Sequence, residues 1–185
     1  MSIQARILEA PMASNIEIKA RARDFDTQKK LAASISESKV QRLVQEDVFF
    51  NVPAGRLKLR ILGPDNGELI YYLRPDTSSV KTCKYWISPT VKPPALLETL
   101  TRALGVRGVV KKKRHLYTAG QMRIHLDEVE RLGKYIELEY VMKPDEPEKN
   151  GEREVQRFLR HLGIEKEDIV GSAYIDLIAP LKKTA

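Results

Sequence analysis

The sequence predicts a mainly β protein with inserted helices, an α+β fold in which eight antiparallel strands close into a barrel and the helices pack outside it. Eight segments have the length and composition of strands, which is about the number needed to close a small barrel. Three further segments have apolar residues at helical spacing and interrupt the strands. Charged and apolar residues alternate along several strands, which gives the predicted sheet one charged face and one apolar face.

The predicted strands follow one another with short connections. Turn residues mark two of the breaks, around residues 51–55 and 63–67, where asparagine, proline, aspartate and glycine occur. Such clusters are typical of hairpin connections between antiparallel strands. The expected strands lie near residues 14–24, 41–51, 56–62, 67–74, 81–88, 108–118, 121–129 and 134–143.

The three predicted helices each carry an apolar stripe. The first covers about residues 26–38, and the second follows a proline pair and ends at Gly105, a residue typical of helix C-termini. The third has its apolar residues at helical spacing before Gly163. We expect these apolar side chains to pack in the core and to carry no chemistry. Residues 174–178 are expected to form a short terminal packing segment.

At 185 residues the chain is long enough for one domain with a substantial core. We expect a loose leader over residues 1–13, a single domain over 14–180 and a short tail over 181–185. No apolar run approaches the ~20 residues that a membrane helix needs, so no membrane partner is expected. Cys83 is the single cysteine, which excludes an intramolecular disulfide and a multi-cysteine metal site. A reducing cytoplasm is the expected compartment.

Charge alternation is clearest in the first predicted strand. Every odd position from Glu17 to Arg23 is charged, and the even positions between them are apolar. The pattern recurs with three cations over residues 56–61 and with mixed charges over 122–127, and residues 136–140 supply an acidic version. Because alternate side chains of a strand point to opposite faces, these charges share one face.

The charged face has an excess of cations, and the formal net charge of +7 also indicates an anionic partner. Like charges on neighbouring strands repel, so such a face is costly unless an anion binds to it. The helices need the apolar face, which leaves the charged face either in contact with water or turned inward around a cavity. We favour the cavity, because it explains the excess. By position, the face holds the cations Lys19, Arg21, Arg23, Arg56, Lys58, Arg60, Arg74, Lys112, Arg114 and Arg123 and the acids Glu17, Asp127, Glu137 and Glu139.

Carboxylates among these cations indicate a site for a hard metal ion. Oxygen ligands at alternate strand positions suit Mg²⁺ or Mn²⁺, which bridge carboxylates and phosphate oxygens. The three histidines have no zinc-binding spacing, and we expect His125 to line the charged face as a hydrogen-bonding group and not as a ligand. The sequence contains no glycine-rich phosphate-binding loop, so side chains would have to hold any phosphate.

An ordered series of motifs resembles the CYTH family, which includes class IV adenylyl cyclases and thiamine triphosphatases and whose members are also called triphosphate tunnel metalloenzymes. The opening signature of that family, Glu-x-Glu-x-Lys, is similar to NIEIK at residues 15–19. One such motif would be weak support, but the series continues in the expected order to about residue 140. The further matches are DVFFNVP at 47–53, GRLKLR at 55–60, YYLR at 71–74, KKR at 112–114, RIHLDEV at 123–129 and GKYIELE at 133–139.

The resemblance implies an eight-stranded tunnel that binds the triphosphate of its substrate with one or two divalent cations, Mg²⁺ or Mn²⁺. The residues that match its metal-binding carboxylates are Glu17, Asp127, Glu137 and Glu139. The residues assigned to substrate binding are Lys19, Arg21, Arg56, Lys58, Arg60, Arg74, Lys112, Arg114 and Arg123. Among them we assign a catalytic role to Lys19, Arg56 and Arg60, the neutralisation of charge on the phosphates as the leaving group departs.

One departure from the family pattern concerns the metal. Asn15 stands where the family usually has its first glutamate. The amide can coordinate a cation through its carbonyl oxygen, but it adds no negative charge. A subgroup that tolerates asparagine without loss is the alternative, so the number of metals, one or two, stays open.

The working hypothesis is metal-dependent hydrolysis of inorganic tripolyphosphate, thiamine triphosphate or a nucleoside triphosphate. The expected partner is therefore a triphosphate-bearing small molecule or inorganic polyphosphate, whereas nucleic acid is not expected. Cyclisation of ATP to cyclic AMP and pyrophosphate is the alternative within the family. We favour hydrolysis, because water is always available, whereas cyclisation also needs an ordered nucleoside.

A function of another class is a non-catalytic module that binds RNA or polyphosphate. The net charge allows it, and its affinity would fall steeply with salt. Against it, Glu137 and Glu139 would lie among phosphate ligands without a metal to account for them. The sequence does not indicate the oligomeric state.

Overall fold

The computed structural model describes residues 13–178, which form eight strands in one closed barrel. Around the barrel the order is β1-β5-β4-β3-β2-β6-β7-β8, and β8 pairs with β1 to close it. All of these pairings are antiparallel, so the predicted fold class is confirmed. The expected tail and residues 1–12 of the expected leader lie outside the described residues. The strands are β1 (Ala13–Arg21), β2 (Gln41–Phe50), β3 (Arg56–Ile61), β4 (Gly67–Leu73), β5 (Lys81–Thr90), β6 (Val106–Ala119), β7 (Met122–Val129) and β8 (Gly133–Val141).

The strand register brings charged positions of adjacent strands together. Between β1 and β8, Glu17 lies opposite Glu139 and Lys19 lies opposite Glu137. The apolar residues between them, such as Ile18, point to the other face and are buried there beneath the helices. The alternation read from the sequence therefore separates a charged interior from an apolar exterior.

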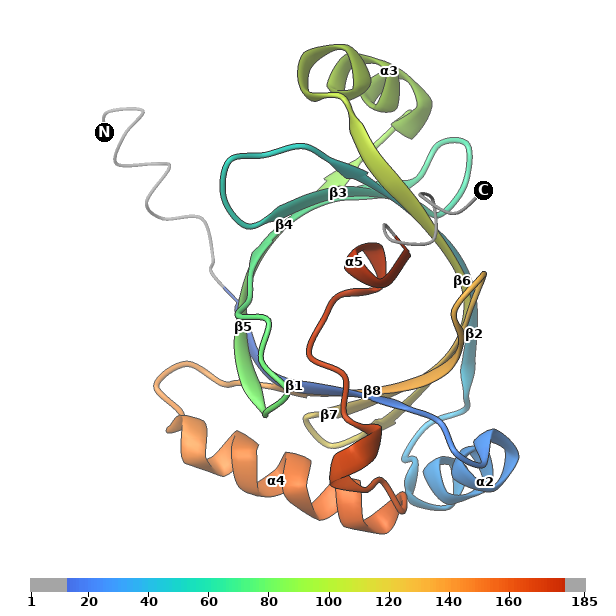
Figure 1. The fold of residues 1–185 in the computed structure, drawn as a ribbon, viewed down its shortest axis with the longest axis vertical. Coiled ribbons are helices and arrows are strands. Elements are labelled where there is room, and N and C mark those ends of the chain that lie inside the picture. The colour runs from blue at the N-terminus through green and yellow to red at the C-terminus, as the bar shows by residue number, and fades with distance from the viewer. Residues whose placement is uncertain (1–12, 179–185) are drawn as a thin grey trace.

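Three helices cover the outside of the barrel: α2 (Phe25–Ile35), α3 (Pro93–Leu104) and α4 (Glu148–His161). In Figure 1, α4 and α2 lie on one side of the barrel and α3 lies on the opposite side. Helix α4 contacts β1 and β8, α2 contacts β6 and β7, and α3 contacts β2 and β3. Gly105 is the C-cap of α3, as predicted. No helix in the described part of the chain is both long enough and apolar enough to cross a membrane.

A fourth helix differs from the other three in its position. After a short 3-10 turn, η1 (Lys166–Asp168), the chain runs to α5 (Tyr174–Ile178), which lies within the outline of the barrel (Figure 1). The backbone N–H of Val170 donates to the carbonyl of Lys19 at 2.9 Å, which attaches this segment to β1. Tyr174 and Ile175 then join an apolar cluster with Phe49 of β2. The prediction that the helices pack outside therefore holds for α2, α3 and α4 but not for α5.

Gly151 lies where α4 crosses the barrel. A Cβ at this position would be 2.6 Å from Cγ1 of Ile16, a fully buried side chain, and 2.9 Å from Cδ1 of Tyr140. Both distances are shorter than van der Waals contact. We expect Gly151→Ala to lower the free energy of unfolding by about 1–3 kcal/mol through overpacking, although alanine favours helices.

Thermal unfolding of the variant measures this effect. The matched control is Gly63→Ala, because a Cβ there would meet nothing within 4 Å. An unchanged or raised Tm for Gly151→Ala would show that α4 can move away from the barrel at no cost.

Candidate active site

The barrel encloses a cavity of about 460 Å³, a size typical of small-molecule sites. All eight strands contribute to its wall, together with the segment that leads into α5. Seven cations against four carboxylates give the lining a net charge of +3 with His125 neutral. The charged lining residues are Lys19, Lys58, Arg60, Arg74, Lys112, Arg114 and Arg123, with Glu17, Asp47, Glu137 and Glu139. The structure thus places most of the predicted charged rows around one interior space.

Two of the predicted cations near the end of β1 do not line this cavity. Arg21 is exposed, and its guanidinium lies over the ring of Tyr135 at 5.4 Å from the centroid. Arg23 follows the end of the strand and pairs with Asp168 at 2.6 Å, with its side chain half exposed. The charge alternation continues past the last paired residue, so the pattern overestimated the length of the charged interior. Neither residue is in position to bind a substrate held in the cavity.

Arg56, to which we assigned a catalytic role, is buried but does not line the cavity either. Its guanidinium binds the carboxylates of Asp76 and Asp176, the latter at 2.7 Å. Asp176 also pairs with Arg107. Because Asp176 lies in α5, these contacts hold α5 on the barrel. In this geometry Arg56 is paired with carboxylates, and its predicted contact with phosphate stays a prediction.

The charge pattern did not identify Asp47, which lies in the densest group of cations. Its Oδ2 accepts from Nζ of Lys58 at 2.8 Å, and its Oδ1 accepts from Nε of Arg60 at 2.8 Å. Lys112 Nζ lies 3.7 Å from Oδ2. Burial alone would raise the pKa of Asp47, but the three cations hold it well below its usual range. We call these four residues the Asp47 clamp.

Burial has the opposite effect on the lysines of the Asp47 clamp. It lowers the pKa of Lys58 and, together with the nearby Arg114, lowers the pKa of Lys112 to about 8. A buried ammonium loses hydration and favours its neutral form. A further anion in the cavity would favour the charged form of both side chains, so the Asp47 clamp is suited to an anionic ligand.

Glu137 connects two of the interior cations. Its Oε1 lies 3.1 Å from Nζ of Lys19, and its Oε2 accepts from Nη2 of Arg114 at 2.6 Å. Burial alone would raise the pKa of Glu137, but Lys19 and Arg114 keep it well below its usual range.

Arg114 also forms two hydrogen bonds to Asp127, at 2.7 and 2.6 Å, and the hydroxyl of Tyr174 donates to the same carboxylate. Asp127, a predicted metal ligand, is fully buried beside Arg114 and orients that guanidinium.

Three donors, one of which is Glu137, converge in a group that can hold a metal ion. The ligand atoms of His125, Glu137 and Glu139 all lie within 4.8 Å of one another. Nδ1 of His125 is 3.5 Å from Oε1 of Glu139 and 3.9 Å from Oε2 of Glu137. This nitrogen is buried and has no hydrogen-bond partner. Two carboxylates and an unpaired imidazole nitrogen around one point fit a divalent cation.

Glu17 and Asn15 lie next to this group. Glu17, which faces Glu139, accepts from Nη1 of Arg74 at 3.0 Å, and burial together with Glu139 raises its pKa. Nδ2 of Asn15 lies 3.5 Å from Oε2 of Glu139, and the hydroxyl of Tyr85 donates to Oδ1 of Asn15 at 3.3 Å. Glu17 stays a predicted ligand, whereas His125 belongs to the group although its strand position predicted only a lining role.

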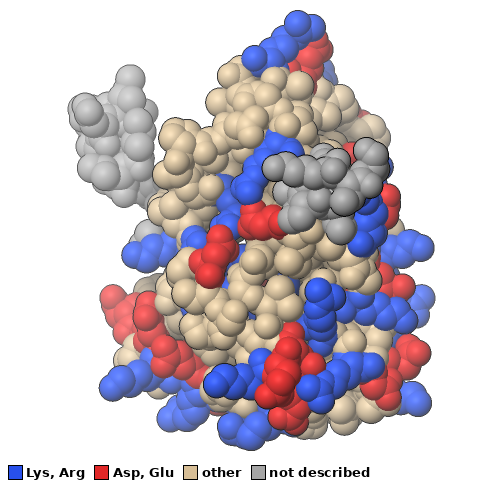
Figure 2. Space-filling model, in the orientation of Figure 1, with Lys and Arg blue, Asp and Glu red and all other residues tan. Residues whose placement is uncertain are grey.

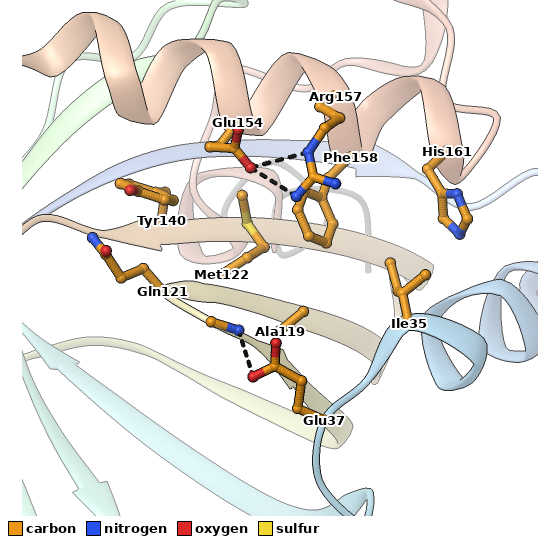
Figure 3. A pocket seen from close by; sticks show the side chains of 11 residues that line it. Ile35, Glu37, Ala119, Gln121, Met122, Tyr140, Glu154, Arg157, Phe158 and His161 are labelled. Carbon is orange, nitrogen blue, oxygen red and sulfur yellow. Dashed lines mark hydrogen bonds and ion pairs between the residues drawn. The ribbon is translucent and has the colours of Figure 1, made fainter.

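A second cavity, of about 420 Å³, lies outside the barrel between α4, the turn from β6 to β7 and the end of α2. Figure 3 shows Phe158 in its wall and two carboxylates that already have partners within the protein. Glu154 pairs with Arg157, and Glu37 accepts from the backbone N–H of Gly120. Among the described residues that line this cavity, Arg157 is the one lysine or arginine. The cavity inside the barrel, with its seven cations, is therefore the candidate site.

The outer surface carries both signs of charge. In Figure 2, lysine and arginine lie beside aspartate and glutamate over α4 and α2 and do not form one broad basic patch. A basic stripe or patch is the usual electrostatic feature of a nucleic-acid interface. On the face shown the charges are mixed, whereas seven cations line the cavity inside the barrel.

Comparisons with known proteins agree with this geometry. The family model described as the CYTH domain matches residues 13–174. A curated protein named "Putative adenylate cyclase MJ0240", from Methanocaldococcus jannaschii, is 22% identical over 169 residues, which cover 88% of this chain and 97% of that protein. The solved structure of PH1012 protein from Pyrococcus horikoshii OT3 has a TM-score of 0.75 at 25% identity and covers 88% of this chain and 98% of its own. The adenylyl cyclase homologue HpAC1 from Hippeastrum, described as having a dominant triphosphatase activity, has a TM-score of 0.59 at 19% identity over 92% of this chain and 97% of its own.

Proposed function

The chain belongs to the CYTH domain family, and from this premise we propose that it hydrolyses a triphosphate bound inside the barrel together with a divalent cation, Mg²⁺ or Mn²⁺. One observation carries the proposal: a closed barrel holds seven cations and a metal-binding group around the same cavity. A triphosphate with its cation supplies the negative charge that this lining lacks. The expected substrate class is a small molecule with a triphosphate group or inorganic polyphosphate.

The cations around the cavity have the chemistry needed to hold phosphate oxygens. Arg60 and Arg114 present planar guanidinium groups that can donate two parallel hydrogen bonds to one phosphate. Lys58 and Lys112 add point charges from strands β3 and β6. All four are paired with carboxylates in the protein, which fixes their positions before a substrate enters. Fixed donors stabilise developing charge without reorganisation during the reaction.

The carboxylates would hold the cation at one side of the phosphates. Glu137 and Glu139 would be its carboxylate ligands, and Glu17 lies next to them. A divalent cation in this place neutralises charge on phosphate oxygens and lowers the pKa of a bound water. Lys19 would stabilise the phosphates as the leaving group departs, since its ammonium lies 3.1 Å from Glu137. The reaction then needs no nucleophile from the protein.

A phosphate-release assay tests this function. Tripolyphosphate, thiamine triphosphate and ATP are each incubated with the full chain in Mg²⁺, in Mn²⁺ and after removal of metal by EDTA. We expect orthophosphate release from at least one of the three with metal, and a loss to background with EDTA. Cyclic AMP and pyrophosphate from ATP, without orthophosphate, would assign cyclisation instead. Tight binding of polyphosphate with no turnover in either metal would assign a binding module.

Two further expectations lie outside the reach of this assay. The cytoplasmic location stays a prediction, as does the exclusion of nucleic acid as a partner. The mixed surface charges in Figure 2 support the second of these.

A further inference from the structure

Nδ1 of His125 is a buried polar atom of the metal-binding group. The residue is 4% exposed, and this nitrogen has no hydrogen-bond partner. Glu139 and Glu137, at 3.5 and 3.9 Å, are too far to accept a hydrogen bond of useful strength. A buried polar group without a partner lowers the stability of the fold, and coordination of a cation by this nitrogen would remove that cost.

We infer that His125 is a direct nitrogen ligand of the divalent cation, and that this ligand makes the site prefer Mn²⁺ to Mg²⁺. The inference rests on the proposed function, because the cation is the one that accompanies the triphosphate. It goes beyond that function by naming a ligand and the metal that the ligand selects.

The spacing of the three donors agrees with this role. At metal–ligand distances of about 2.1 Å, neighbouring ligand atoms lie about 3 Å apart and opposite ones about 4 Å apart. The distances from Nδ1 of His125 to the two carboxylates, 3.5 and 3.9 Å, are between those values.

The donor set determines the metal. Mg²⁺ prefers an all-oxygen set of carboxylates, carbonyls and water, whereas Mn²⁺ belongs to the first-row transition ions, which also bind sites with nitrogen ligands. Asn15 acts in the same direction. It stands near Glu139 with a neutral amide, 3.5 Å from the carboxylate, so it adds no negative charge for a small hard ion. Glu137 is also shared with Lys19 and Arg114, which reduces the charge that it offers to a metal.

Electron paramagnetic resonance of Mn²⁺ bound to the full chain tests the inference, after removal of any histidine tag. We expect an electron spin-echo modulation from a directly coordinated ¹⁴N nucleus. In competition, Mg²⁺ should displace Mn²⁺ only at a large molar excess. His125→Gln should remove the nitrogen modulation and weaken Mn²⁺ binding by about 10- to 100-fold, with less effect on Mg²⁺.

His161→Gln is the matched control, because His161 is exposed at the end of α4. It should leave both the modulation and the metal preference unchanged. The spectrum of the unmodified protein is decisive by itself if His125→Gln fails to fold. If Mn²⁺ binds without ¹⁴N modulation while phosphate release still depends on metal, this inference is overturned and the proposed function stands. Nitrogen-coordinated Mn²⁺ without any turnover would support the ligand assignment and overturn the proposed function.

Discussion

Glu137→Gln is expected to lower kcat/KM for the best triphosphate substrate about 1000-fold. The amide is similar in size to the carboxylate but carries no charge, so it weakens the hold on the cation between His125 and Glu139. A metal ion stabilises the phosphate charge of the transition state by several kcal/mol. A loss of about 4 kcal/mol of that stabilisation corresponds to the expected 1000-fold fall in kcat/KM. Lys19 and Arg114 lose a charged partner in the same variant.

The same substitution separates the enzyme from a binding module. With one negative charge removed from the lining, polyphosphate affinity should stay the same or increase, while turnover falls. Steady-state kinetics and calorimetric binding of polyphosphate measure the two effects on one preparation. Glu152→Gln, an exposed change on α4, is the control for the loss of a carboxylate. Retention of full activity in Glu137→Gln would remove Glu137 from the metal site.

Asp47→Asn is expected to lower the free energy of unfolding by about 3–5 kcal/mol. The reason is that three cations, Lys112 fully buried and Lys58 and Arg60 mostly so, would remain near one another without their common counter-ion. A polyanion in the cavity can supply the missing negative charge. Saturating tripolyphosphate should therefore raise the Tm of this variant more than it raises the Tm of the unmodified protein.

The pH dependence of stability gives an independent reading of the same side chain. The pKa of Asp47 in the fold is well below its usual range. Its contribution is therefore fully present above its ordinary pKa of about 4 and is lost as the pH falls through the folded-state pKa. The Asn variant should lack this part of the acid-side decline.

Denaturant unfolding with and without tripolyphosphate, at pH 7 and under acid conditions, measures these effects. Asp65→Asn in the exposed turn before β4 is the control. If Asp47→Asn is as stable as the unmodified protein without any anion, then Asp47 is not the counter-ion that keeps the three cations of the Asp47 clamp buried.

The strands were predictable from sequence because the charges alternate with the pleat. Every predicted strand is present, and most ends agree within two or three residues. The clearest errors are at the ends of two elements. At one end the charge pattern continues beyond the last residue of the strand, and at the other the helix begins before any apolar pattern does. Charge alternation runs to Arg23 although β1 ends at Arg21, and α4 starts at Glu148, well before its first regularly spaced apolar residue, Val155. The first turns of α4 are polar and contain Gly151, so they lack the spaced apolar residues from which the helices were predicted.

The sequence predicted that the site is a charged interior, but it did not predict which charged side chains pair with one another. Asp47 was missed because β2 lacks clean alternation: Phe49, on the same face, also lines the cavity. Position along a strand also cannot show which side chains are already paired within the protein, as Arg56 and Asp127 are. Their partners come from elsewhere in the chain, Asp176 for Arg56 and Arg114 for Asp127.

The measurement that tests the central claim most directly is a crystal structure of the full chain with tripolyphosphate and Mn²⁺, with the metal located by anomalous scattering. The phosphate chain should lie inside the barrel, with its oxygens within hydrogen-bond distance of Lys58, Arg60 and Arg114. The anomalous peak should lie between the phosphates and Glu137 and Glu139. Tripolyphosphate bound only on the outer surface, with solvent alone between those side chains, would contradict the claim.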